Sequence, residues 1–115
     1  MWIYTQSGFF SVVHKPPCKQ EELLIRSRSI TDIELLHEQL IDKFSFNGTI
    51  IKTPRADYAY RMVVPRNIFA DLISDQIKNL NYENFKNTIP HSDRRRHEAY
   101  LQCWEAMWKW QRVSK

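Results

Sequence analysis

Arginine and aromatic residues occupy alternate positions in segments that have the composition of β-strands. Arg26 and Arg28 would lie on one face of a strand, about 7 Å apart, a spacing that suits adjacent phosphate or carboxylate groups. Rings stack on nucleic-acid bases, and guanidinium groups pair with phosphates. If the faces coincide, they form a binding platform; the alternative is that the rings belong to the core and the arginines to a solvated edge. Two further segments place a pair of rings on one face in the same way: Trp2 with Tyr4, and Tyr58 with Tyr60.

Polar residues beside these rings supply the other groups that a nucleotide needs. Asp57 and Asn84 would hydrogen-bond a base or a sugar, while Arg61 and Lys86 would add positive charge for phosphate. The alternative is structural, because Asn most often caps and turns the backbone. The predicted ligand-binding set is Trp2, Tyr4, Arg26, Arg28, Asp57, Tyr58, Tyr60, Arg61, Asn84 and Lys86.

A second basic cluster lies in residues 91–97, HSDRRRH, at the start of a predicted helix. An anion there would be held by free backbone amides, the helix dipole and guanidinium groups together. Consecutive helical residues diverge by about 100°, so at most two of Arg94, Arg95 and Arg96 can converge. The alternative to this secondary basic patch is an ordinary solvated surface.

No motif of known catalytic chemistry is present. The four histidines and two cysteines show no metal-binding spacing, and the two glycines are too few for a phosphate-cradling loop. We therefore predict no catalytic residue, no metal ligand and no cofactor, with an enzyme acting on nucleotides kept as an alternative.

Length and composition indicate a single domain formed by residues 1–115. The net charge of +4, from 17 Lys and Arg against 13 Asp and Glu, favours anionic partners. No apolar run approaches the roughly 20 residues of a membrane span, and the N-terminal segment does not resemble a secretory signal. With only Cys18 and Cys103, reduced thiols are expected. We expect a cytoplasmic protein with no membrane partner.

The pattern of elements predicts an α+β fold. We expect a hairpin over residues 1–15, strands over 23–29, 49–52 and 58–64, and helices over 32–43, from Pro65 to about 80, and from a Ser92 cap to about 113. The first helix carries a capping box from Thr31 to Glu34. The favoured architecture is a mostly antiparallel sheet with helices on one face: a ferredoxin-like core with an N-terminal hairpin and an extra C-terminal helix. Leu23 and Ile25 would face the helices, which directs Arg26 and Arg28 to the opposite side.

The last predicted helix has an apolar stripe that we expect to be core. Trp104 and Trp108 are four residues apart and share a face, Cys103 lies on the same stripe, and Trp110 points elsewhere. Exposed Trp is enriched at interfaces, so Trp110 is a candidate contact for a protein partner or a second copy of the chain.

Several segments resemble a small family of proteins of unknown function from bacteria and their phages. The resemblance spans nearly the whole chain but departs at Pro65, where a Ser or Thr helix cap is expected, and over residues 49–55. It implies no particular activity, although a small phage-linked protein would suit sequestration of a ligand or inhibition of a host defence protein. The segments are MWxxTxxGFFS (1–11), RSR (26–28), ADYAYR (56–61), YENFKN (82–87) and Tyr100 with Trp104.

The sequence therefore favours non-catalytic binding of a phosphate-bearing ligand, either a nucleotide or a nucleic acid strand. The first alternative is a protein–protein interaction factor that acts through the basic patch or Trp110. The second alternative is a small enzyme acting on nucleotides.

Overall fold

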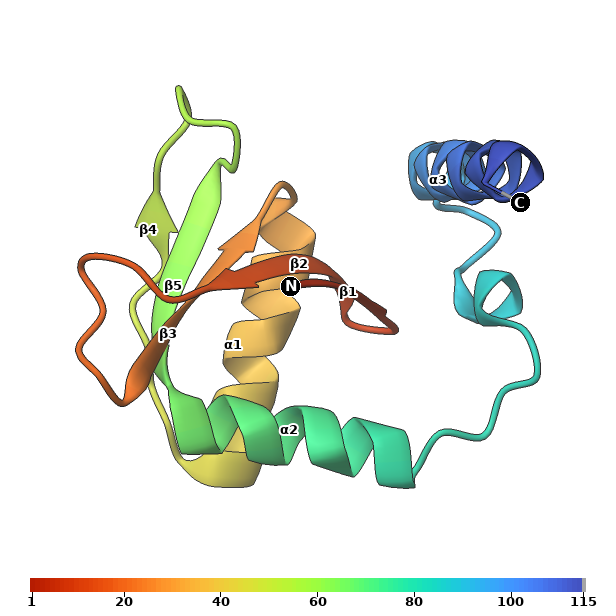
Figure 1. Cartoon of the computed structure of the whole chain (residues 1–115). Helices are drawn as coiled ribbons and strands as arrows, with labels where there is room; N and C mark the ends of the chain where they lie inside the picture. The colour runs from red at the N-terminus through yellow and green to blue at the C-terminus, as the bar shows by residue number, and fades with distance from the viewer. Residues whose placement is uncertain (115) are drawn as a thin grey trace. The chain divides into compact units, whose positions relative to one another are not determined.

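The computed structural model describes residues 1–114, which form two compact units, Met1–Leu80 and a second unit that begins at Asn81 (Figure 1). The first unit contains a five-stranded sheet and two helices, and the second contains one short and one long helix. The α+β class is confirmed. The single domain over residues 1–115 stays a prediction, and each unit is described by itself.

The sheet of the first unit is antiparallel throughout, with the strand order β1-β2-β3-β5-β4. Helix α1 follows β3 and helix α2 follows β5, so β3, α1, β4, β5 and α2 have the chain order of the first five elements of a ferredoxin-like core, whose last strand is absent from residues 1–114. The N-terminal hairpin extends the sheet beyond β3, as expected. The strands are β1 (Trp2–Thr5), β2 (Gly8–Val13), β3 (Glu22–Ser27), β4 (Ile51–Lys52) and β5 (Tyr60–Pro65); the helices are α1 (Ile30–Phe44) and α2 (Arg66–Lys78).

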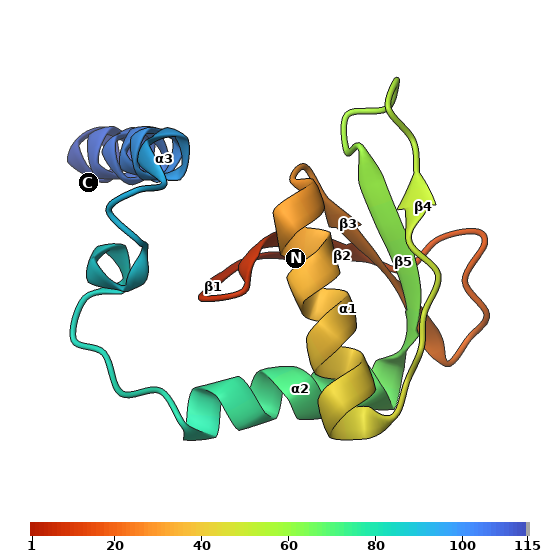
Figure 2. The same cartoon turned by 180° about the vertical axis from the view of Figure 1, so that it is seen from behind.

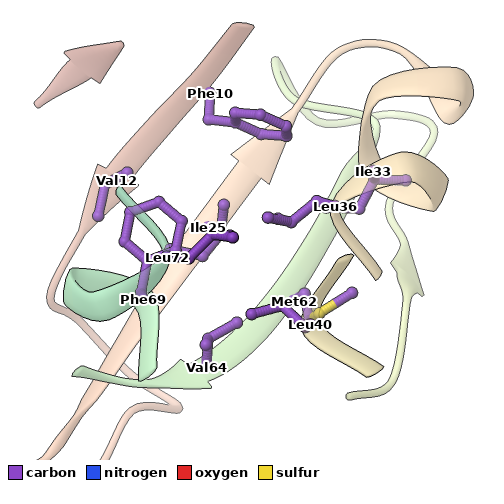
Figure 3. Close-up of a cluster of buried hydrophobic side chains, with 10 residues drawn as sticks. All are labelled: Phe10, Val12, Ile25, Ile33, Leu36, Leu40, Met62, Val64, Phe69 and Leu72. Atoms are coloured by element: carbon purple, nitrogen blue, oxygen red, sulfur yellow. The ribbon is translucent and has the colours of Figure 1, made fainter. Parts of the chain in front are cut away.

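Both helices cover the same face of the sheet, which we call the inner face (Figure 2). Val12 lies opposite Ile25 and Ile25 lies opposite Met62, so these side chains form one row across three strands. Leu36 of α1 and Leu72 of α2 pack against this row (Figure 3). Each fully buried aliphatic side chain contributes roughly 1.5–3 kcal/mol, so this row is what fixes the helices to the sheet.

The start of α1 differs from the prediction of a capping box at Thr31. The helix is capped by Ser29, whose Oγ accepts a hydrogen bond from the amide of Asp32. Asp32 is 4% exposed, and its Oδ2 accepts from the amide of Phe9, 3.1 Å away. The buried carboxylate therefore ties α1 to the hairpin, a long-range contact that no local helix signal encodes.

Gly8 makes this contact sterically feasible. Its φ is +135°, and a Cβ at this position would lie 2.2 Å from Cγ of Asp32. A residue with a side chain would be strained here and would also collide with the carboxylate.

Other boundaries shift by a few residues. Strand β5 begins at Tyr60 rather than at residue 58, because residues 53–59 form a loop closed by the amide of Thr53 on the carbonyl of Ala59. Pro65 is the residue just before α2, as expected for a proline that opens a helix. Helix α2 ends at Lys78 rather than near residue 80, and Ile77 and Leu80 are exposed.

The second unit contains the 3-10 helix η1 (Phe85–Thr88) and helix α3 (Arg94–Val113). Asp93 caps α3, not Ser92, and its side chain accepts from the amide of Arg96. No residue of α3 is buried, so the prediction that Trp104, Trp108 and Cys103 are core residues is wrong. Among residues 1–114, no helix combines the length and apolar character that crossing a membrane requires.

Candidate functional site

The side of the sheet opposite the helices, which we call the outer face, carries the predicted charged and aromatic residues. The pairing register places Trp2 opposite Ser11, Ser11 opposite Arg26 and Arg26 opposite Arg61, so these four residues form one row across β1, β2, β3 and β5. Paired residues in a sheet share a face, and that face alternates along each strand. The outer face therefore combines rings at its β1 edge with two guanidinium groups at its centre.

Arg26 and Arg61 lie directly opposite each other on neighbouring strands. Like charges in this position destabilise a sheet, so the arrangement needs compensation. The Nη2 of Arg26 donates to Oγ of Ser11 at 2.7 Å, and Nε of Arg61 donates to Oγ1 of Thr53 at 3.2 Å. Hydroxyl oxygens orient the two side chains but leave their positive charge in place.

Tyr58 organises the third arginine of the outer face. The guanidinium carbons of Arg26 and Arg28 each lie 4.5 Å from the centre of the Tyr58 ring, which is only 4% exposed. The loop that carries Tyr58 is held by Thr53, whose hydroxyl donates to the carbonyl of Tyr58 at 2.7 Å. Cation–π contacts of this kind are worth about 0.5–2 kcal/mol each, so the ring fixes both guanidinium groups.

The charges of the outer face are not balanced. Within residues 1–114, the only ion pair of these three arginines joins Arg61 to Asp57, 3.7 Å away, and the Asp57 side chain is 69% exposed. In that same part of the chain, neither Arg26 nor Arg28 has a carboxylate within 4.0 Å. The Nε of Arg26 is buried and has no hydrogen-bond partner among the described residues. Around Tyr58, three arginines and one aspartate leave a local excess of two positive charges, an arrangement suited to an anion. Glu22 shares this face of β3 but lies four residues from Arg26, and its Oε1 accepts from the amide of Lys19.

The β1 edge of the outer face is aromatic. Trp2 is 71% exposed and Tyr4 is 39% exposed. The ring of Phe9 contacts both, with its centroid 6.4 Å from that of Trp2 and 4.7 Å from that of Tyr4. A cluster of rings held at the edge of a sheet offers exposed π-surface on which bases can stack.

The structure brings together most of the predicted ligand-binding set, but not in the predicted roles. Tyr60 lies on the inner face, opposite Ser27, and packs against the core, so the prediction that it shares a platform with Tyr58 is wrong. The physical reason is that Tyr58 precedes the strand, where the period-two alternation does not apply. Tyr58 itself is covered by arginines, which leaves Trp2 and Tyr4 as the exposed rings of the predicted set on the outer face.

Asn84 and Lys86 belong to the second unit. Oδ1 of Asn84 accepts from the amide of Lys86 at 3.0 Å, so Asn84 caps η1, the structural role that was the alternative for it. Nζ of Lys86 lies 5.7 Å from the ring centre of Trp104. Neither residue is added to the outer face, since the two units are described separately.

The three arginines of the predicted basic patch separate into different environments. Nε of Arg96 donates to Asp93 at 2.9 Å, and Nη1 donates to the hydroxyl of Tyr100 at 2.9 Å. The hydrogen bond from Arg96 holds the pKa of Asp93 below its ordinary value. Arg94, together with Lys86, lines a hollow of about 400 Å³, and Arg95 is exposed. The divergence of consecutive helical residues is confirmed.

Three residues that complete the outer face were not predicted: Phe9, Ser11 and Thr53. Phe9 and Ser11 alternate along β2, a signal visible in the sequence, but only the pairing register places Ser11 beside Arg26. No group of three or more His, Cys, Asp or Glu residues within 1–114 could hold a metal ion.

Trp110 is 60% exposed, and its role as a contact for a protein partner or a second copy stays a prediction.

No family model, curated protein or solved structure matches this chain. The resemblance to the bacterial and phage family therefore stays a prediction based on the segments quoted above.

Proposed function

We propose that the outer face of the sheet binds a phosphate-bearing ligand, either a nucleotide or a nucleic acid strand, without catalysing a reaction on it. The observation that carries the proposal is the direct opposition of Arg26 and Arg61, joined by Arg28 and left with a single exposed carboxylate. Folding alone does not require this pattern, because like charges opposite each other cost stability. A bound anion would convert the repulsion into attraction.

Each type of side chain on the outer face would bind a different part of the ligand. Arg26, Arg28 and Arg61 would bind phosphate oxygens, since guanidinium groups form strong charge-assisted hydrogen bonds with them. Trp2 and Tyr4 would stack on a base, because their rings are exposed on the same face. Asp57 is exposed enough to accept a hydrogen bond from a sugar or a base. Binding of this kind fits ligand sequestration in phage–host conflict, the role that the family resemblance suggested.

The experiment is a titration of the full chain with a fluorescent single-stranded hexanucleotide and with a fluorescent nucleoside triphosphate, followed by anisotropy at low salt. Arg26→Gln should weaken binding by at least about tenfold, since a hydrogen bond to a charged group is worth about 1.5–3 kcal/mol. Lys78→Gln is the matched control, because it removes one charge from the exposed end of α2 in the helix layer. We expect the control to change the affinity less than twofold.

Two results would overturn the proposal. One is that neither the hexanucleotide nor the nucleoside triphosphate binds at low salt. The other is an equal loss of affinity in Arg26→Gln and Lys78→Gln, which would show that net charge rather than the outer face attracts the probes.

A further inference from the structure

The exposed rings and the row of cations define the class of ligand more narrowly. We infer that the outer face binds a single strand of at least two nucleotides, which crosses the sheet from β1 towards β5, rather than a mononucleotide or a duplex. This inference rests on the proposed function, since it concerns the same surface.

The number of exposed rings is the first argument. Trp2 and Tyr4 are two residues apart on β1, so their side chains leave the backbone about 7 Å apart on the same face. A mononucleotide has one base and can stack on one of these rings. Occupation of both rings requires two bases, and hence a strand.

The position of the cations is the second argument. Arg26 lies two strands away from Trp2 and Arg61 lies three strands away, which corresponds to about 10 Å and about 14 Å at the usual strand spacing. The side chains on this row change from ring to hydroxyl to guanidinium, in the order Trp2, Ser11, Arg26, Arg61. A strand whose first two bases stack on Tyr4 and Trp2, and which then follows the row, would place its next phosphates over β3 and β5.

The exposure of the rings argues against a duplex. The bases of a duplex are stacked on one another and paired, so their faces cannot reach a ring that projects from a sheet. The bases of a single strand can be splayed apart and stacked on protein side chains. The combination of ring stacking and backbone charge is therefore specific for unpaired nucleotides.

The test compares four probes on the full chain: thymidine and uridine hexanucleotides, thymidine monophosphate, and a twelve-base-pair duplex. We expect at least one hexanucleotide to bind tenfold or more tightly than the monophosphate and more tightly than the duplex. Trp2→Ala should weaken hexanucleotide binding by about fivefold to 150-fold, the equivalent of about 1–3 kcal/mol for one stacked base. Trp110→Ala is the matched control, since it removes an exposed tryptophan from the second unit.

Different outcomes test the preference for a single strand and the proposed binding of a phosphate-bearing ligand. Equal affinities for monophosphate and hexanucleotides, both lowered by Arg26→Gln, would overturn the inference while leaving the proposed function intact. Duplex binding as tight as that of the hexanucleotides, or equal effects of Trp2→Ala and Trp110→Ala, would also overturn it. If none of the probes binds, the proposed function itself fails.

Discussion

The two faces of the sheet are built from the same strands but have opposite character. On the inner face, Ile25 lies between Val12 and Met62, and all three are at most 6% exposed. On the outer face, the neighbouring position of β3 is Arg26, which lies between Ser11 and Arg61. One step along the strand therefore separates the apolar core from the row of arginines. The other outer-face neighbour of Ile25 is Leu24, which lies between Val13 and Val63 and is itself buried.

Folding explains the residues of the inner face but not the opposed arginines of the outer face. The inner face follows from the hydrophobic effect, because its side chains lose contact with water when the helices pack on them. The outer face gains little from folding at its centre, where two like charges face each other. Groups retained at a cost in stability are most simply explained by a ligand, which is why the outer face is the proposed site.

The largest effect is expected on the inner face. Ile25→Ala should lower the free energy of unfolding by about 2–5 kcal/mol, because it leaves a cavity at the centre of the core. Urea unfolding followed by circular dichroism measures this change. A loss below about 1 kcal/mol would mean that the helices do not pack on this face as described.

The second largest loss of stability is expected where the N-terminal hairpin contacts α1. Gly8→Ala combines an unfavourable positive φ with a collision against Asp32, and we expect a loss of about 1–3 kcal/mol. The same urea experiment detects it. An unchanged midpoint for Gly8→Ala would contradict the contact between the hairpin and α1.

Tyr58 links stability to binding on the outer face. Tyr58→Leu keeps an apolar side chain but removes both cation–π contacts, so unfolding should become easier by about 1–2 kcal/mol. Hexanucleotide affinity should fall as well, because Arg26 and Arg28 lose the ring that orients them. A variant that loses stability but retains full affinity would show that the ring does not position the arginines for a ligand.

The smallest effect on stability is expected at Arg61. Arg61→Gln loses a weak contact with Asp57 and the hydrogen bond to Thr53 but relieves the repulsion from Arg26, so the free energy of unfolding should change by no more than about 0.5 kcal/mol. Hexanucleotide binding should still change. When the logarithm of the association constant is plotted against the logarithm of the salt concentration, the unmodified chain should give a slope of about −2. The slope for the variant should be shallower by about 0.7. An unchanged slope would exclude Arg61 from the phosphate contacts.

Much of the fold could be predicted from local patterns in the sequence. The alternation of Leu23, Ile25 and Ser27 with Arg26 assigned the correct side of β3 to the helices, since burial repeats every second residue in a strand. The limits of β5 and the cap of α1 could not be predicted in this way. Both depend on contacts between distant residues: the loop closed by Thr53, and the buried bond from Asp32 to Phe9.

Most residues of the candidate site could be predicted from the sequence, but their positions relative to one another could not. The chemistry of Trp2, Arg26 and Arg28 is evident from their types and spacing. That Arg61 lies opposite Arg26 is fixed by the pairing of β3 with β5, which a single sequence does not encode locally. The expectation that Tyr58 and Tyr60 share a face failed because the alternation was extended back to residue 58, whereas the strand begins at Tyr60 and Tyr58 lies in the preceding loop.

The most direct test of the outer face as a binding site is a nuclear magnetic resonance titration of the ¹⁵N-labelled chain with the hexanucleotide that binds more tightly. We expect shifts of the indole N–H of Trp2 and of the Nε–H groups of Arg26 and Arg61, with the amides on the exposed sides of α1 and α2 unchanged. Shifts confined to those helices or to the second unit, with the signals of Trp2 and both arginines unmoved, would contradict it.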